Sequence, residues 1–168
     1  MKSTQTKALE IIYTFFVGIL VAVFVGVGIA AFYEEPKEPQ YPAMLKVYSV
    51  PVAPGTASTT SAQLEQVQTK YDKDYIVFQE KMNVYNRNVS IIALIAAIIL
   101  SAVSITFFKN LRVIADGLLL GGVITLLYSV VRIFGSGDDK VRFLVVAVGL
   151  VVALALGYKK FIVNTQKE

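Results

Sequence analysis

Apolar residues gather in four long runs, and one long polar stretch separates the first run from the second. The runs cover residues 8–33, 89–108, 113–134 and 141–160. Each is close to the roughly 20 apolar residues that an α-helix needs to cross the hydrocarbon core of a bilayer. The first run is longer than the roughly 7 to 15 residues of a signal-peptide core, so we expect an uncleaved span. The pattern predicts four transmembrane helices.

The polar stretch between the first two runs begins with a linker, residues 34–61, that holds all five prolines of the chain. Because proline lacks a backbone N–H and clashes with the preceding turn, we expect no helix in this linker. Its residues 44–50 are apolar enough to form a strand or an irregular segment. Thr60 and Gln63 match a capping box, which predicts that a helix starts at about residue 62.

The second half of the polar stretch, residues 62–88, has the pattern of an amphipathic helix. Its apolar residues recur at steps of three and four on one face, while the opposite face carries Lys, Glu, Asp and Arg. We call the apolar set the ridge: Leu64, Val67, Tyr71, Tyr75, Phe78, Met82 and Tyr85. Residues 43–52 of the linker are one candidate cover for the ridge, and another copy or a partner protein is the other.

No proline or glycine lies between Ala62 and Phe108, so the amphipathic helix is predicted to continue into the second span. Such a helix would be on the order of 70 Å long, about twice the bilayer core. The predicted fold class is therefore an all-α membrane protein with four transmembrane helices and a long extracytoplasmic helical extension of the second span. This rigid helix requires that no break occurs between Asn86 and Ser90.

The charges predict how the chain sits in the membrane. Basic residues at the short connections concentrate on the side of the two termini, which predicts a multi-pass plasma-membrane protein with both termini cytoplasmic and residues 34–88 outside. With 55% hydrophobic and 17% charged residues, the chain is too apolar for an ordinary soluble domain. The net charge of +4 comes from scattered Lys and Arg, so we expect no nucleic-acid partner.

Small residues recur four apart within each span, a spacing that lets helix backbones approach closely in lipid. This predicts a packed four-helix bundle, in which the small residues serve either packing within one chain or a contact between identical copies. The small residues predicted to pack are Gly18, Ala22, Gly26 and Ala30 in the first span, Ala93, Ala97 and Ser101 in the second, Gly117 and Gly121 in the third, and Gly149, Ala153 and Gly157 in the fourth.

Little in the sequence points to chemistry. The chain has no cysteine and no histidine, and it carries no nucleotide-binding or zinc-protease motif, so we expect no catalytic, cofactor-binding or metal site. Two charges lie within the spans: Asp116 is expected to pair with Arg112, and Arg132 to reach toward the membrane surface as an anchor. Asp138 is expected to cap the last span.

The function predicted from these features is that of a non-enzymatic integral membrane protein whose extracytoplasmic amphipathic helix mediates self-assembly or partner binding. Its expected partners are the lipid bilayer and either further copies of the chain or a membrane or extracytoplasmic protein. The alternative is a component of a channel or small-solute transporter, with Ser101, Ser104, Thr125 and Ser129 facing one another between the second and third spans. A membrane-embedded enzyme is the third and least supported class, because no nucleophile and base are seen together.

Overall fold

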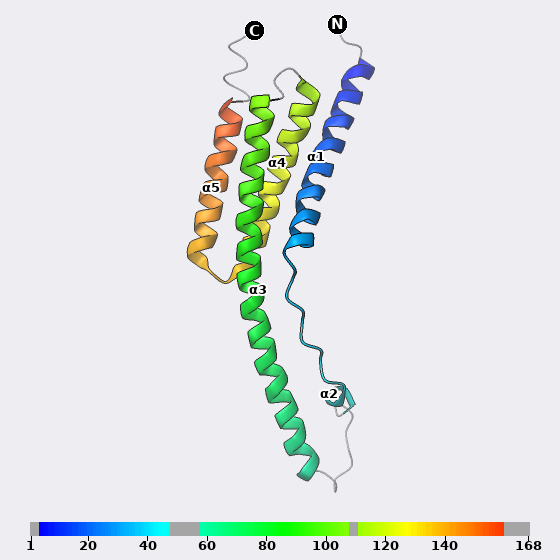
Figure 1. The fold of residues 1–168 in the computed structure, drawn as a ribbon, viewed down its shortest axis with the longest axis vertical. Coiled ribbons are helices and arrows are strands. Elements are labelled where there is room, and N and C mark those ends of the chain that lie inside the picture. The colour runs from blue at the N-terminus through cyan, green and yellow to red at the C-terminus, as the bar shows by residue number, and fades with distance from the viewer. Residues whose placement is uncertain (1–3, 48–57, 108–110, 160–168) are drawn as a thin grey trace.

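The computed structural model describes residues 4–47, 58–107 and 111–159, and this part of the chain is all-helical, with no strand. Four of its helices are long and apolar enough to cross a membrane. In chain order the elements are α1 (Thr4–Phe32), α2 (Ala43–Val47), α3 (Ser58–Phe107), α4 (Arg112–Ile133), the short 3₁₀ helix η1 (Phe134–Ser136) and α5 (Asp139–Gly157) (Figure 1).

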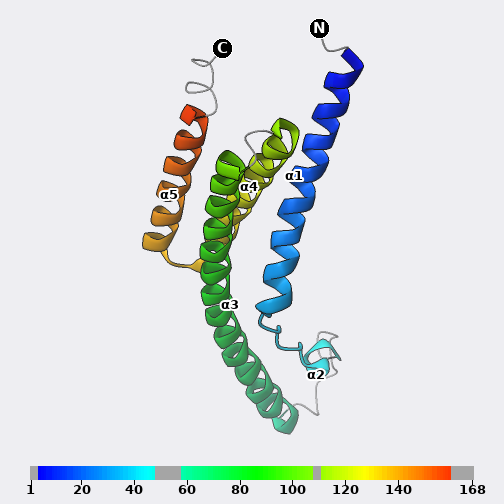
Figure 2. The ribbon, with the colours of Figure 1, turned by 45° about the horizontal axis from the view of Figure 1, so that its top comes forward.

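The longest element, α3, is one continuous helix of 50 residues that passes through Asn86 to Ser90 without a break. It curves along its length and extends well beyond the ends of the other long helices (Figure 2). The helix begins at Ser58, so the prediction that Thr60 and Gln63 mark its start is wrong. No proline follows Pro54, and nothing in the sequence stops the helix from starting a turn earlier.

The linker contains a short helix that we did not predict. Residues 43–47 form α2, where we expected a strand or an irregular segment. Pro42 precedes it, and Leu45 donates its backbone N–H to the Pro42 carbonyl. Proline is favoured at the start of a helix, and Ala, Met, Leu and Lys are good helix formers. Residues 48–52, the rest of the expected cover, lie outside the described residues.

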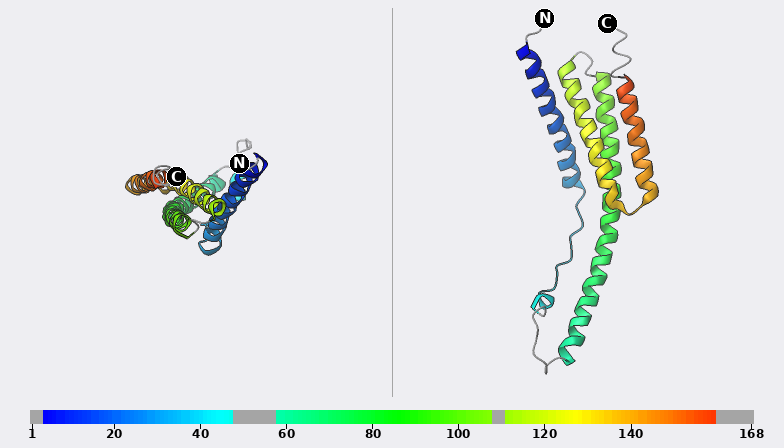
Figure 3. Two further views of the ribbon diagram at one scale, coloured as in Figure 1. Left: turned by 90° about the horizontal axis from the view of Figure 1, so that it is seen from above. Right: turned by 180° about the vertical axis from the view of Figure 1, so that it is seen from behind.

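The long helices are arranged around a central pair, α3 and α4. Helices α1 and α4 run in the same direction, and α3 and α5 run in the opposite one (Figure 1). Helix α1 packs mainly on α4, whereas α5 packs on both members of the central pair. Seen along the helices, α1 and α5 lie on opposite sides of the pair (Figure 3). The four helices therefore do not close around one shared core, and many large apolar residues of α1 and α5 remain exposed.

The helix ends define the common level at which the spans finish. There α1 ends at Phe32, α4 passes into η1, and Gly137 turns the chain with a φ of 69°. Asp138 then caps α5, because its carboxylate accepts hydrogen bonds from the backbone N–H groups of Lys140 and Val141, which confirms the predicted cap.

Candidate functional site

Helices α3 and α4 are joined by buried hydroxyl groups. The hydroxyl of Ser90 donates to the carbonyl oxygen of Ser129 at 2.8 Å, and the hydroxyl of Ser129 donates back to the carbonyl of Ser90 at 2.8 Å. Both residues are fully buried. Ser104 adds a third bond between the helices, from its hydroxyl to the carbonyl of Ala115. Lipid tails offer no hydrogen-bond partner to a hydroxyl group, so hydroxyls on facing helices bond across the contact. These bonds fix the register of the pair.

The hydroxyls expected to line a transport path are used in this packing. Ser101 donates to the Ala97 carbonyl and Thr125 to the Gly121 carbonyl, each within its own helix. Both side chains are buried, as are Ser104 and Ser129. All four expected residues thus lie in or beside the α3 and α4 contact with their hydroxyls hydrogen-bonded to the backbone. They give the channel interpretation no support within one copy of the chain.

Helices α1 and α4 approach each other closely through three glycines. A Cβ added to Gly117 would lie 2.8 Å from the Cβ of Val17, and one added to Gly121 would lie 2.8 Å from the Cβ of Val21. On the other side, a Cβ on Gly18 would meet the Leu120 side chain at 2.9 Å. Val17 and Val21 of α1 therefore each lie over a glycine of α4, with the numbering rising in the same direction along both helices. This is a parallel contact of the kind that glycines four apart allow in membranes.

The remaining small residues divide into packed and open positions. Ala93, Ala97 and Ser101 are buried on α3, and Gly149 is buried on α5 against Leu126 and Val130 of α4. The others lie toward the surface: Ala22 is half-buried, Gly26 and Gly157 have nothing within 4 Å of an added Cβ, and Ala30 and Ala153 are exposed. The small residues of α1 and α5 are thus packed against other helices over only part of each helix.

A group of polar and aromatic residues gathers where α1 ends, which we call the junction cluster: Tyr33, Glu35, Tyr85, Asn88 and Arg132. The Arg132 guanidinium donates to the Glu35 carboxylate at 3.1 Å and lies 5.1 Å from the centre of the Tyr85 ring. The Tyr85 and Tyr33 rings stack at 5.2 Å, and the Asn88 amide donates to the Tyr33 hydroxyl at 2.8 Å. The cluster therefore ties the start of the linker to α3 and α4.

Further contacts hold η1 and α5 to α3 at the same level. The Asn86 amide donates to the Gly135 carbonyl at 3.0 Å, and Arg142 donates to the Phe134 carbonyl and to Asp139. Of the two charges predicted inside the spans, Arg132 belongs to the junction cluster. Asp116 is half-buried near the start of α4 and has an interaction partner.

The ridge lies on the part of α3 that extends past the other helices. Its first six residues are half-buried, and Tyr85 is buried in the junction cluster. The rings of Tyr71, Tyr75 and Phe78 form a row, with each centre 6.0 Å from the next. From the linker, Tyr41 meets Tyr71 edge to face at 5.1 Å. Burial, together with the nearby carboxylate of Glu38, raises the pKa of Tyr71 above its usual value of 10.0.

Acidic side chains in the part of the chain that the structure describes do not gather into a metal centre. No group of three His, Cys, Asp or Glu side chains in residues 4–47, 58–107 and 111–159 comes together as a metal site. Comparison with known proteins gives no family model, no curated protein and no solved structure that matches the chain. The ridge and the junction cluster are therefore the features from which function has to be argued.

The sequence indicated the ridge but not the junction cluster. Glu35 and Arg132 are 97 positions apart, and Tyr33 and Asn88 are 55 apart, so no local pattern links them. Asn88, Val89 and Ser90 form an Asn-x-Ser glycosylation sequon at the start of the predicted second span. In the structure both polar side chains of that sequon are hydrogen-bonded to other elements. The one available signal was that Tyr33, Asn88 and Arg132 all lie near predicted span ends.

We expect Arg132→Gln to loosen the linker from the helices, because it removes the bond to Glu35 and the contact with the Tyr85 ring. The expected cost is about 1 kcal/mol, since both partners of the ion pair are partly exposed. Limited proteolysis of residues 34–47 should then be several-fold faster. Arg142→Gln is the matched control, because that arginine lies at the same end and, among the described residues, donates hydrogen bonds to Asp139 and Phe134 rather than to the linker. Equal cleavage rates in the two variants would contradict the role of Arg132 in holding the linker to the helices.

Proposed function

We propose that the chain is a non-enzymatic membrane protein whose extension, residues 58–84 of α3, stands outside the bilayer and mediates self-assembly or binding of a partner protein. The concentration of basic residues on the side of the two termini, including the connection between the second and third spans, supports placing both termini in the cytoplasm and the extension outside. Four apolar helices support the membrane location.

The row of aromatic rings on the ridge is the observation that carries this proposal. Tyr75 and Phe78 stay half-exposed on a helix that extends beyond the spans, and the described linker reaches the row at Tyr71 through Tyr41. Half-exposed aromatic side chains in a row are typical of protein contact surfaces, where Tyr and Trp dominate the binding energy. Ile76 and Val77 add exposed apolar area on the same stretch.

Changing Tyr75 and Phe78 together to serine is expected to leave membrane insertion intact and to abolish association of the chain in detergent or nanodiscs. Central aromatic residues of an interface contribute about 2 kcal/mol or more each, so the double change should weaken association by a hundredfold or more. Mass from light scattering measures the result. Lys70→Ser with Lys73→Ser is the control, because both side chains are exposed on the charged face.

An unchanged mass in the Tyr75 and Phe78 variant would exclude self-assembly through the ridge. If the unaltered chain is already a single copy in nanodiscs, crosslinking in the native membrane tests the partner version of the proposal. In that case a crosslinked partner that is lost in the double variant, and kept in the lysine control, is the expected result.

A further inference from the structure

The linker leaves the junction cluster and runs beside the extension, and we call its residues 34–41 the strap. Directly before the strap, the Tyr33 ring stacks on Tyr85 of α3 at 5.2 Å. At its far end, the Tyr41 ring meets Tyr71 of α3 edge to face at 5.1 Å. Figure 3 shows the linker and α2 beside the extension, and α2 contacts α3 as well. The strap is thus attached to the ridge at two levels.

The strap has little slack between these two attachments. The distance along α3 from Tyr71 to Tyr85 is about 21 Å at the rise of an α-helix. The chain from Tyr33 to Tyr41 covers about 25 Å in the polyproline conformation, which the two prolines of the strap favour. The strap therefore runs nearly extended past the ridge residues that lie between its attachments. These residues, all half-buried, are Tyr75, Phe78 and Met82.

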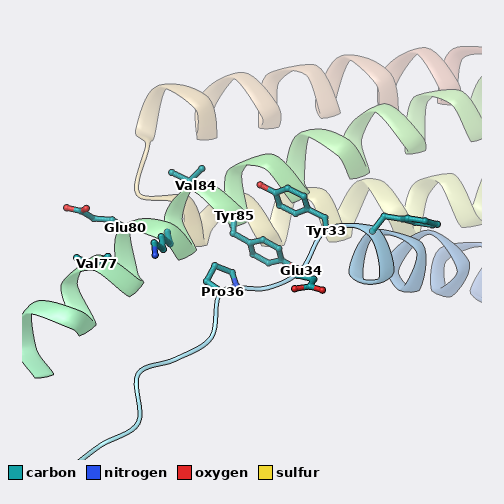
Figure 4. Close-up of a pocket in the computed structure, with 9 residues that line it drawn as sticks. Tyr33, Glu34, Pro36, Val77, Glu80, Val84 and Tyr85 are labelled. Carbon is teal, nitrogen blue, oxygen red and sulfur yellow. The ribbon is translucent and has the colours of Figure 1, made fainter.

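The strap does not seal against the helix near its base. An open pocket of about 540 Å³ is lined there by both segments (Figure 4). Pro36 of the strap contributes to its walls, as do Val77 and Val84 of α3, which remain 48% and 46% exposed. The strap therefore packs closely at its two attachments and more loosely between them.

The two attachments differ in how deeply they are buried. At the base, Tyr85 is only 6% exposed, and Glu35 of the strap also bonds to Arg132 at 3.1 Å. At the far end, the Tyr41 ring is 49% exposed, so it buries less apolar area and its contact with Tyr71 is the weaker one. The strap can therefore open at its far end while its base stays attached.

We propose that the strap is an autoinhibitory cover, which must leave Tyr71 before a second copy of the chain can pack along the whole ridge. The inference rests on the proposed function, because it needs the ridge to mediate self-assembly. Two copies in one bilayer carry Tyr71 at the same height, so a two-fold contact sets the same row of rings against itself. A ring of the second copy then takes the place of the Tyr41 ring.

Association in detergent, measured by light scattering over a range of protein concentrations, tests the strap. Tyr41→Ser removes the ring contact and leaves the ridge unchanged. We expect association to become about threefold to tenfold tighter, which is the effect of losing one aromatic pair. Gln40→Ser should leave association unchanged and is the matched control, because Gln40 is the exposed neighbour of Tyr41. A Tyr41→Ser chain that associates no more tightly than the unaltered chain, or that stays a single copy throughout, would overturn the proposal.

A crosslink tests the covered state directly. Tyr41→Cys with Gln68→Cys introduces two thiols at the far end of the strap, since Gln68 is exposed on the turn of α3 before Tyr71 and the chain has no cysteine of its own. A short bis-thiosulfonate reagent should join them within single copies. We expect the crosslinked chain to stay a single copy and to associate once dithiothreitol cleaves the link. Equal association before and after reduction, or no crosslink within single copies, would contradict the cover.

The double change of Tyr75 and Phe78 to serine separates failure of the strap from failure of the proposed function. If that variant loses association while the two strap tests show no effect, the ridge is the contact surface and only the strap is excluded. If that variant associates as the unaltered chain does, self-assembly through the ridge is excluded, and the strap proposal with it.

Discussion

Replacing Gly117 and Gly121 together by alanine is expected to separate α1 from α4 and to lower the free energy of unfolding by about 2 kcal/mol or more. Each new methyl group would lie 2.8 Å from a valine Cβ of α1, and that on Gly121 also 3.0 Å from the Gly18 carbonyl oxygen. A backbone oxygen cannot rotate away, so the helices must move apart, and overpacking of this kind typically costs about 1 to 3 kcal/mol per site.

The matched control for the glycine variant is Gly26→Ala, because an added Cβ at Gly26 meets nothing within 4 Å. Alanine is a better helix former than glycine by about 1 kcal/mol, so this control should be neutral or slightly stabilising. Titration with SDS in mixed micelles gives the free energy of unfolding of both variants. Equal effects at the two sites would show that the close contact between α1 and α4 does not stabilise the protein.

Replacing Arg87 by proline is expected to break α3 at the level where the other helices end. Proline removes the backbone bond to the Asn83 carbonyl and clashes with that carbonyl, at a cost of about 3 kcal/mol or more in a helix interior. Arg87→Ala is the matched control, because it removes the same side chain without affecting the backbone. In the proline variant the extension should change direction relative to the spans. In the alanine variant it should keep its direction.

Spin labels on Gln68→Cys and Ala102→Cys measure this break, since both positions are exposed and the chain has no cysteine of its own. An unbroken helix places the two sites roughly 50 Å apart in a narrow distribution. In the proline variant the distribution should broaden and shift to shorter distances. A narrow distribution that is the same in both variants would show that contacts of the linker, rather than the helix itself, hold the extension in place.

The continuity of α3 could be predicted from the sequence because it depends on local chemistry. The stretch from Ala62 to Phe108 lacks proline and glycine, and a backbone without such residues favours one helix. The exact start could not be predicted in the same way. Ser, Thr and Ala between residues 57 and 62 are all compatible with the first turn, and the helix begins at Ser58.

The choice of helix partners could not be predicted from the sequence. Gly117 and Gly121 indicated a close contact, but their spacing does not say which helix provides it. A long linker and the extension of α3 separate α1 from the other spans. The order of the helices in the chain therefore does not indicate which helix packs against α1. The decision depends on how the valines of α1 fit over these glycines, which is a property of three-dimensional shape.

The candidate sites likewise differ in whether a local sequence pattern predicts them. The ridge could be recognised from steps of three and four because all its members lie on one helix face. The ion pair of Glu35 and Arg132 and the pocket beside the linker could not, since each joins segments far apart in the sequence. Such contacts depend on how the spans pack and on their ends lying at one level.

In the proposed orientation, with the extension outside the bilayer, the unbroken course of α3 makes the protein a spacer of defined height. Residues 58–84 rise roughly 40 Å from the level of the span ends, and no described break within them allows that distance to collapse. Anything that docks near Leu64 is consequently held at a fixed distance from the lipid, whereas anything that docks near Met82 is held close to it. Position along the ridge thus specifies how far from the bilayer a bound protein stands.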